Sequence, residues 1–353
     1  MKNSKTAYLL ITFISIVLIL YWGKDLILPL AIAIMISFVI KEVKKQLSKL
    51  SIKGYKFSNW VLTILSFGII VLSLIVIGNV LYSNVIRITD VIPSYHKNIN
   101  LLVSKFVNFK SIDLTIITKE WLNAEKISSI LKIAVESITS IFSNSILILL
   151  YLVFIMLESS IFSKKIKLIY TERKSYQDIK YIIDNINNSM SRYITLKTIT
   201  SITTGVLSYI VLLLLGIDFA FFWAFLIFIL NYIPTIGSLI ATLFPALISL
   251  LQFGTFINPM IVLVAIGSIQ FLVGNVIEPK LMGNSLNVSP LVVLISLAFW
   301  GTIWGVTGMI LSIPITIMII ISCSQFKSTK WIAILLSENG NILEKYTTHH
   351  FKI

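Results

Sequence analysis

Long apolar runs, separated by short polar segments, form the main pattern along this chain. A transmembrane α-helix needs about 20 consecutive, predominantly apolar residues to cross a hydrocarbon core of about 30 Å. The runs that approach or exceed this length are 7–22, 26–40, 60–82, 143–157, 198–215, 219–251, 259–277 and 288–321. The pattern predicts an all-α, polytopic membrane protein with about eight hydrophobic segments.

One run is too long for a single straight crossing. Residues 219–251 number 33 and carry no charge, and a continuous helix of that length would measure about 50 Å. Near its centre, Pro234 removes a backbone donor and disfavours helical angles at Ile233. Gly237 tolerates the backbone angles that a break requires. We therefore predict that the helix breaks within 231–237.

The run 288–321 is equally long, at 34 residues, and is interrupted by small residues and proline: Gly301, Gly305, Gly308 and Pro314. We predict that 219–251 and 288–321 each turn back as a re-entrant helical hairpin; two kinked spans are the alternative that the sequence leaves open. Two such hairpins would enter from opposite faces and bring their tips to a shared site, as in inverted-repeat transporters.

The polar segments divide the chain into five parts. In order they are an N-terminal pair of spans with a basic cytoplasmic loop (1–58), two spans that flank a polar region (59–157), a basic amphipathic cytoplasmic segment (158–197), a transport core with the broken segments (198–322) and a cytoplasmic tail (323–353).

The polar region within the second part is 83–142, and apolar positions in 121–142 recur at helical intervals. This periodicity predicts amphipathic helices outside the membrane core. We expect their apolar faces to pack on the protein's own spans; a partner subunit and the membrane surface are the alternatives.

Composition agrees with a membrane protein, because 57% of residues are hydrophobic and only 12% are charged. The net charge of +14 is explained better by basic cytoplasmic loops than by a nucleic-acid partner. With the N-terminus inside, the inside segments hold 21 of the 29 Lys and Arg. This bias predicts that both termini are cytoplasmic.

Motifs of soluble enzymes are missing from the sequence. It contains no Gly-x-x-x-x-Gly-Lys-Ser/Thr phosphate loop and no Gly-x-Ser-x-Gly nucleophile elbow. Its three histidines, His96, His349 and His350, are too dispersed to predict a metal site, and Cys323 is the single cysteine. We therefore expect no enzymatic activity, no cofactor and no metal.

Uncharged polar residues inside the apolar runs are the candidate binding residues, since they offer donors and acceptors at less desolvation cost than a charge. Together with the breaking residues and one carboxylate, the candidates are Asn231, Tyr232, Pro234, Thr235, Gly237, Gln270, Asn275 and Glu278. They suit a neutral, hydroxyl-rich solute, although such residues also join helices to one another.

Glu278 is the only carboxylate close to a broken segment late in the chain. It either binds a coupling cation or forms an ion pair with Lys280. We favour the ion pair. With the apolar runs bounded as above, no ionisable side chain lies in the middle of a run. A further set is assigned to hinges and helix packing: Pro279, Gly283, Pro290, Gly301, Gly305 and Pro314.

Four blocks, Asn231–Gly237, Gly274–Gly283, Ser289–Leu294 and Gly301–Pro314, agree in order and spacing with one family pattern. In these blocks the chain resembles the autoinducer-2 exporter (AI-2E) family, also called the PerM-like permeases. Ser289 departs from the pattern, because many relatives carry His there, so a role of that His in proton or substrate handling is not carried over. The matching positions are Asn231, Pro234, Gly237, Asn275, Glu278, Pro279, Gly283, Pro290 and Pro314.

The resemblance implies a bacterial multi-pass protein of the inner, or cytoplasmic, membrane that assembles as a homo-oligomer. Family members are linked to export of the furanosyl signal autoinducer-2 (AI-2), and some to Na⁺ or Li⁺/H⁺ antiport. Our first hypothesis is a secondary transporter, or permease, that exports a small neutral polar solute such as AI-2 across the lipid bilayer.

Two other functions stay open. A Na⁺(Li⁺)/H⁺ antiporter, with H⁺ or Na⁺ as the coupling ion, ranks lower because most antiporters place a carboxylate at depth. A non-transporting membrane scaffold that recruits partners through 83–142 is the third.

Overall fold

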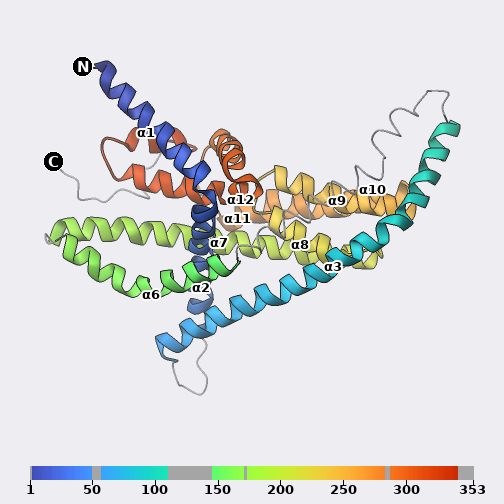
Figure 1. Ribbon diagram of the computed structural model, residues 1–353, viewed down its shortest axis with the longest axis horizontal. Helices are drawn as coiled ribbons and strands as arrows, with labels where there is room; N and C mark the ends of the chain where they lie inside the picture. The colour runs from blue at the N-terminus through green and yellow to red at the C-terminus, as the bar shows by residue number, and fades with distance from the viewer. Residues whose placement is uncertain (1, 50–56, 110–144, 171–172, 283–286, 341–353) are drawn as a thin grey trace. The chain divides into compact units, whose positions relative to one another are not determined.

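The computed structural model describes residues 2–49, 57–109, 145–170, 173–282 and 287–340, and within these ranges its regular structure is helical throughout (Figure 1). The helices are α1 (Lys2–Trp22), α2 (Lys24–Leu47), α3 (Asn59–Phe109), α6 (Ser145–Ile169), α7 (Arg173–Leu214), α8 (Ala220–Leu230), α9 (Ile236–Phe253), α10 (Ile257–Leu272), the π-helical turn η1 (Val273–Ile277), α11 (Glu278–Met282), α12 (Pro290–Ser324) and α13 (Lys330–Leu336).

Six helical segments in the described ranges are long and apolar enough to cross a membrane: Lys24–Leu47, Asn59–Leu81, Tyr176–Leu214, Ile236–Phe253, Ile257–Met282 and Pro290–Ser324. Shorter apolar helices lie at Leu10–Trp22, Ser145–Ser159 and Ala220–Leu230. Many large apolar side chains on these helices are exposed, which in a membrane protein is the surface that lipid covers. The predicted all-α, polytopic membrane fold is confirmed.

The chain forms two compact units, which are described separately. The first comprises 1–67, 143–195 and 284–353; the second comprises 68–142 and 196–283. The two interrupted runs therefore belong to different units: α12 to the first, and α8 with α9 to the second.

In the first unit, α12 is a helical hairpin rather than a straight rod. Gly305 has φ 64° and ψ −147°, far from helical values, and divides α12 into two arms. The hydroxyl of Ser296 on the first arm lies 2.6 Å from the hydroxyl of Thr316 and 3.2 Å from the carbonyl oxygen of Ser312 on the second. The arms thus fold back against each other, and the hairpin predicted for 288–321 is confirmed.

The tip of this hairpin packs against α1 and α2. Trp300, Ile303, Trp304 and Leu311 are buried there, and side chains of both N-terminal helices pack around them. The indole Nε1 of Trp304 donates a 3.0 Å hydrogen bond to the carbonyl oxygen of Leu20. Leu20 lies in the last turn of α1, where carbonyl groups lack intrahelical partners, so Trp304 both fills the core and caps α1.

In the second unit, α8 and α9 form the other hairpin. The rings of Trp223 in α8 and Phe244 in α9 stack with centroids 6.0 Å apart. Trp223 precedes the break at 231–235 by about the same number of residues as Phe244 follows it, so the two helices run antiparallel (Figure 1). The hairpin predicted for 219–251 is confirmed.

Helix α7 corrects one predicted boundary. A cytoplasmic segment at 158–197 and a separate span from 198 were expected, but α7 runs without interruption from Arg173 to Leu214. The segment around 194–197 contains no Pro or Gly, so nothing in the local sequence stops the helix. The boundary was predicted only because the segment before residue 198 is basic.

A further point concerns Pro279 and Gly283, which were assigned to hinges and helix packing. Helical structure continues through α11 to Met282, and the irregularity is the π-helical turn η1 one turn earlier. Pro279 lacks an N–H group, and its ring would clash with a carbonyl four residues earlier in a regular α-helix. A π-helical turn changes that register, so the helix absorbs Pro279 without ending.

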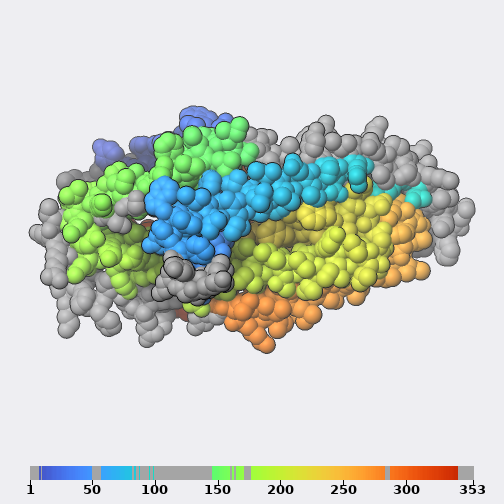
Figure 2. All heavy atoms as spheres, turned by 90° about the horizontal axis from the view of Figure 1, so that it is seen from below, coloured from blue at the N-terminus to red at the C-terminus, as the bar shows by residue number. Residues whose placement is uncertain are grey.

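The base of the α8–α9 hairpin, opposite its tip, is clamped to α3. The hydroxyl of Tyr95 donates a 2.8 Å hydrogen bond to Asp218, and the amide of Asn98 donates to the carbonyl oxygens of Leu251 and Gln252 at the end of α9. The amide group of Gln252 also bridges to the turn before α8, through Gly216 and Asp218. Figure 2 shows the cyan atoms of α3 next to the yellow atoms of 196–283, within the second unit.

Two further predictions concern the polar region and the tail. The first part of 83–142 continues α3 to Phe109, whereas the amphipathic helix predicted for 121–142 lies outside the described residues. The tail expected at 323–353 begins with the last residues of α12 and carries the helix α13. The amide of Ser289 bonds to the carbonyl oxygen of Leu336 at 3.0 Å and joins this helix to the start of α12.

Candidate functional site

The tip of the α8–α9 hairpin contains a strained turn. The amide of Ile236 donates a 2.6 Å hydrogen bond to the carbonyl oxygen of Pro234, and Thr235 between them has φ 59° and ψ −60°. These values describe a positive-φ γ-turn, which is rare and strained, and a β-branched residue is unusual at positive φ. Strain of this kind is often stored at functional sites. The Thr235 side chain is exposed.

Gly237 makes the reversal possible because the tip leaves no room for a side chain. A β-carbon at this position would lie 1.9 Å from the carbonyl oxygen of Leu230. The amide of Gly237 bonds to the carbonyl oxygen of Ile233 at 3.2 Å. The last turn of α8 and the first turn of α9 therefore meet directly at Gly237, and the tip is compact.

Two polar side chains of the tip bind hydroxyl groups of α7. The amide Nδ2 of Asn231 donates a 3.0 Å hydrogen bond to the hydroxyl of Ser201, and both side chains are buried. The hydroxyl of Tyr232 lies 2.7 Å from the hydroxyl of Thr198. These contacts hold the opened backbone of the hairpin against α7.

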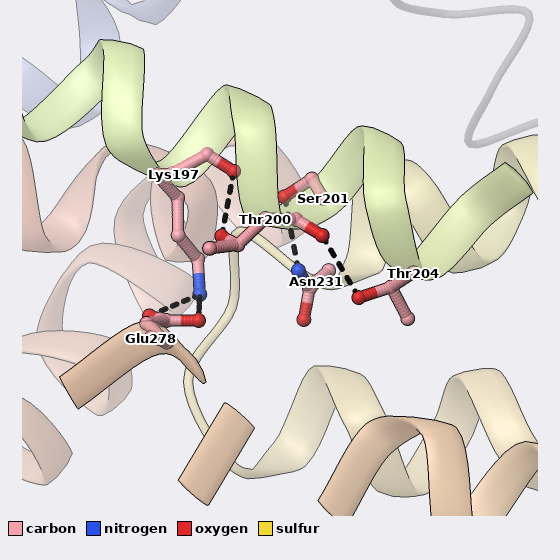
Figure 3. A network of polar contacts seen from close by, with 6 residues as sticks. All are labelled: Lys197, Thr200, Ser201, Thr204, Asn231 and Glu278. Carbon is pink, nitrogen blue, oxygen red and sulfur yellow. Dashed lines mark hydrogen bonds and ion pairs between the residues drawn. The ribbon is translucent and has the colours of Figure 1, made fainter. Parts of the chain in front are cut away.

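An ion pair lies on the same face of α7, one helical turn away. The ammonium group of Lys197 lies 2.7 and 2.9 Å from the two carboxylate oxygens of Glu278 in α11 (Figure 3). The Lys197 side chain is only 6% exposed and that of Glu278 18%. The predicted pairing of Glu278 with Lys280 is therefore wrong, since Lys280 is exposed to solvent or lipid.

No ionisable side chain was expected in the middle of an apolar run, and both members of this pair lie at the ends of such runs, Lys197 before 198–215 and Glu278 after 259–277. Lys197 belongs to the candidate span Tyr176–Leu214, and Glu278 belongs to Ile257–Met282. Charged groups inside membrane helices are costly and are therefore usually paired and functional. Among the described residues no group of three or more His, Cys, Asp or Glu could hold a metal ion.

The spacing along α7 explains why these groups gather. Lys197 and Ser201 are four residues apart and so share one face of the helix, as Figure 3 shows. On that face the hydroxyl groups of Thr200 and Thr204 donate hydrogen bonds to backbone carbonyl oxygens of α7 itself. The result is a polar surface of hydroxyls, an amide and a mutually neutralised charge pair inside otherwise apolar helices.

Such a surface can bind a small polar molecule through hydrogen bonds. Its amide and hydroxyl groups both donate and accept, while the opposite charges of Lys197 and Glu278 cancel, so that the surface has no net charge.

The remaining predicted binding residues lie apart from these contacts. Gln270 is buried in α10, and its Nε2 has no hydrogen-bond partner among the described residues. Asn275 lies in η1 and is exposed. Pro234 is half-buried beside Thr235 at the tip.

The predicted hinge and packing residues have varied positions. Pro290 is the first residue of α12, Pro314 is buried within its second arm, and Pro279 is exposed in α11; Gly283 lies outside the described residues. Gly301 and Gly305 were assigned to hinges and helix packing, and Gly305 supplies the positive φ of the hairpin tip. A β-carbon on Gly301 would lie 2.8 Å from the Met309 side chain.

Sequence reasoning missed the contribution of α7. Lys197 was assigned to a basic loop, and Thr198 and Ser201 were counted only as part of an apolar run. A signal was present, because Lys197, Ser201, Thr204 and Ser208 recur every three or four residues. This spacing places them on one helical face, and all four are buried.

Comparison with known proteins places this architecture in a family. A family model described as AI-2E family transporter matches residues 10–327. The AI-2 transport protein TqsA of Escherichia coli K12 is 29% identical over 322 residues, which cover 90% of this chain and 91% of TqsA.

Two further relatives are similar over most of their length. A Borreliella burgdorferi protein named as a candidate transport protein is 30% identical over 82% of this chain and 79% of its own. A Haemophilus influenzae protein named in the same way is 27% identical over 96% of this chain and 99% of its own. The chain belongs to the AI-2E family of transporters.

Proposed function

We propose that this protein is a secondary transporter, without enzymatic activity, that exports a small neutral polar solute across the cytoplasmic membrane. The observation that carries the proposal is the polar contact between a broken hairpin and a spanning helix, in which buried Asn231 binds Ser201. A broken backbone inside a membrane is tolerated where protein or a water-filled cavity covers it, and transporters bind solutes at such breaks.

The proposed solute is AI-2. TqsA, which is similar to this chain over nine-tenths of its length, is named as an AI-2 transport protein. The groups at the hairpin tip support a neutral, hydroxyl-rich solute of this kind, because hydroxyl and amide side chains there surround a charge pair of zero net charge.

The proposed setting is a homo-oligomer with both termini in the cytoplasm. The distribution of Lys and Arg in the sequence supports this orientation. We propose the proton as the coupling ion. Two titratable groups, Lys197 on α7 and Glu278 on α11, lie next to the tip of the α8–α9 hairpin.

Transport by inside-out vesicles tests the proposal. Vesicles that contain the protein should accumulate AI-2 under a proton gradient, and Asn231→Ala should lower the initial rate by at least about tenfold if one hydrogen bond of about 1.4 kcal/mol in the transported complex is lost. Failure of the wild-type protein to move AI-2 would remove the proposed solute; an Asn231→Ala rate equal to that of the wild type would remove the proposed site.

A matched control lies on the same helix. The hydroxyl of Thr203 bonds only to the carbonyl oxygen of Ile199 within α7 and lies outside the network of Figure 3. Thr203→Val should therefore leave the rate near that of the wild type, whereas Ser201→Ala should lower it together with Asn231→Ala.

Cation/proton antiport is the second candidate, and the buried carboxylate of Glu278 favours it. In proteoliposomes with a fluorescent pH indicator, an antiporter would release protons when external Na⁺ or Li⁺ is added. Glu278→Gln would abolish that signal. A wild-type protein that gives no cation-dependent signal while it transports AI-2 would exclude this candidate.

A further inference from the structure

The π-helical turn η1 ends directly on the residue that carries the buried carboxylate. The backbone N–H of Glu278 donates to the carbonyl oxygen of Val273, five residues earlier, which is the hydrogen bond of a π-helix. A π-helical turn contains one residue more than the α-helical turn it replaces. The position of Glu278 on the helix surface therefore depends on this extra residue.

Pro279 explains why the π-helical turn is present. The side chains of the turn are themselves little packed. Residues 274–277, which make up most of η1, are all exposed. A β-carbon on Gly274 would have no atom within 4 Å. The turn is thus not held in place by side-chain packing around it, and its register depends on Pro279 and on its own backbone hydrogen bonds.

A change of register would move Glu278 away from its partner. If the extra residue passes out of η1, every residue on one side of the turn rotates about the helix axis by about 100° and shifts by about 1.5 Å, the values for one residue of an α-helix. Glu278 and Lys197 make both of their contacts over less than 3 Å, so a rotation of this size separates them.

We propose that η1 is a register switch that opens and closes the Lys197–Glu278 ion pair during transport. In the structure the turn is in the π register and the pair is closed beside Asn231 and Tyr232 at the hairpin tip. Passage of the turn to the α register, against the clash that Pro279 then makes, opens the pair and uncovers Lys197 on the polar face of α7 and the carboxylate of Glu278 on α11. This inference rests on the proposed function for its role in transport, but the two registers themselves do not depend on the solute.

The direct test measures the register. Two nitroxide labels are attached to exposed positions of the same compact unit, Lys280→Cys on α11 and Ile202→Cys on α7, in a Cys323→Ser background. Pulsed electron resonance in proteoliposomes should show two distance populations whose ratio changes when AI-2 is added. A single population that AI-2 does not alter would overturn the proposal.

A deletion removes the switch. Without Val276 the helix loses the extra residue while both flanks keep their faces, and Pro279→Ala in the same chain removes the clash that would oppose an α-helical register. Pro279→Ala alone retains the extra residue and serves as the reference. The deletion variant should show one population and transport at least about tenfold more slowly than the reference, because the second state is no longer accessible.

The outcomes separate this inference from the proposed function. Equal transport by the deletion variant and its Pro279→Ala reference would overturn the register switch, whatever the solute. Two populations that collapse to one on deletion, in a protein that moves no AI-2, would support the switch and remove only the proposed solute. If the deletion variant does not fold, the distance measurement on the otherwise intact chain still decides the matter.

Discussion

Lys197 and Glu278 lie 81 residues apart in the sequence, and the ammonium group of one touches both carboxylate oxygens of the other. The pair joins α7 to α11 at the level of the hairpin tip, and both residues belong to the second compact unit. Removing one member of a buried pair leaves the other charge without compensation, whereas replacing both with apolar residues is often tolerated.

We therefore expect a strong double-mutant coupling between these two residues. Lys197→Met and Glu278→Leu should each lower the free energy of unfolding in detergent by about 3–5 kcal/mol, while the double variant that carries both substitutions should recover most of the loss. Denaturant unfolding followed by circular dichroism measures all of these variants.

The exposed pair Lys165–Glu158, whose side chains are 57% and 49% accessible, is the control. The same cycle there should give a coupling of at most about 1 kcal/mol. Equal coupling energies for the two pairs would contradict the view that burial makes the Lys197–Glu278 pair important.

The two hairpins could be predicted from the sequence because their tips use residues with a strong local effect. Pro234 and Gly237 interrupt one uncharged run and Gly305 the other, and each run exceeds what a bilayer accommodates in one straight helix. Local sequence is sufficient for such breaks, since the constraint acts on the backbone of the residue itself.

The partners across α7 could not be predicted in the same way. Lys197 borders an apolar run. When hydropathy is averaged over a window of residues, a charged residue at such a border is assigned to the preceding loop. Its pairing with Glu278 depends on how α7 packs against α11, which no local pattern encodes. The preference for Lys280 as a partner reflected closeness in the sequence, but Lys280 is only two residues from Glu278, and residues at that separation point to different sides of a helix.

Gly237 should be the least replaceable glycine of the α8–α9 hairpin. In Gly237→Ala the new methyl group would lie 1.9 Å from the carbonyl oxygen of Leu230, so the backbone of the tip must move. We expect a loss of at least about 3 kcal/mol in the free energy of unfolding, because overpacking a rigid site is costly.

Gly267, in the middle of α10, is the matched control for this substitution. A β-carbon there would meet no atom within 4 Å, and Ala is favoured over Gly in a helix by about 1 kcal/mol. Gly267→Ala should leave the melting temperature unchanged or raise it. A Gly237→Ala protein as stable as Gly267→Ala would show that the tip is looser than the structure indicates.

Gly305 should be required for the backbone angles of the α12 tip rather than for space. Its φ of 64° and ψ of −147° lie in a region that is almost restricted to glycine, and forcing another residue into it costs about 1–3 kcal/mol. Gly305→Ala should lower the melting temperature accordingly, although no atom lies within 4 Å of the added methyl group.

Gly68→Ala is the control that distinguishes a requirement for backbone angles from a requirement for space. Gly68 is also free of close neighbours, but it lies within the helix α3 and its φ is not positive. Gly68→Ala should be neutral or stabilising. Destabilisation by both substitutions to the same degree would refute the conformational role assigned to Gly305.

Tyr95 should make the stability of the second unit sensitive to alkaline pH. Burial and the neighbouring carboxylate of Asp218 raise the pKa of the Tyr95 hydroxyl well above its usual value of about 10. A raised pKa means that the neutral, protonated form is favoured in the folded state. Its contribution to stability is complete below pH 10 and is lost as the pH rises above 10, because only the unfolded chain then ionises readily.

Replacement of this hydroxyl tests the sign of the effect. Tyr95→Phe removes the hydrogen bond to Asp218 and should cost about 1–2 kcal/mol at pH 8. The difference in melting temperature between the wild type and Tyr95→Phe should then shrink between pH 9.5 and 11, since only the wild type loses stability through this group. Tyr8→Phe, at a side chain that is 71% exposed, should leave the wild-type pH profile unchanged. A gap that widens with rising pH would reverse the sign and show that Tyr95 is ionised in the folded protein.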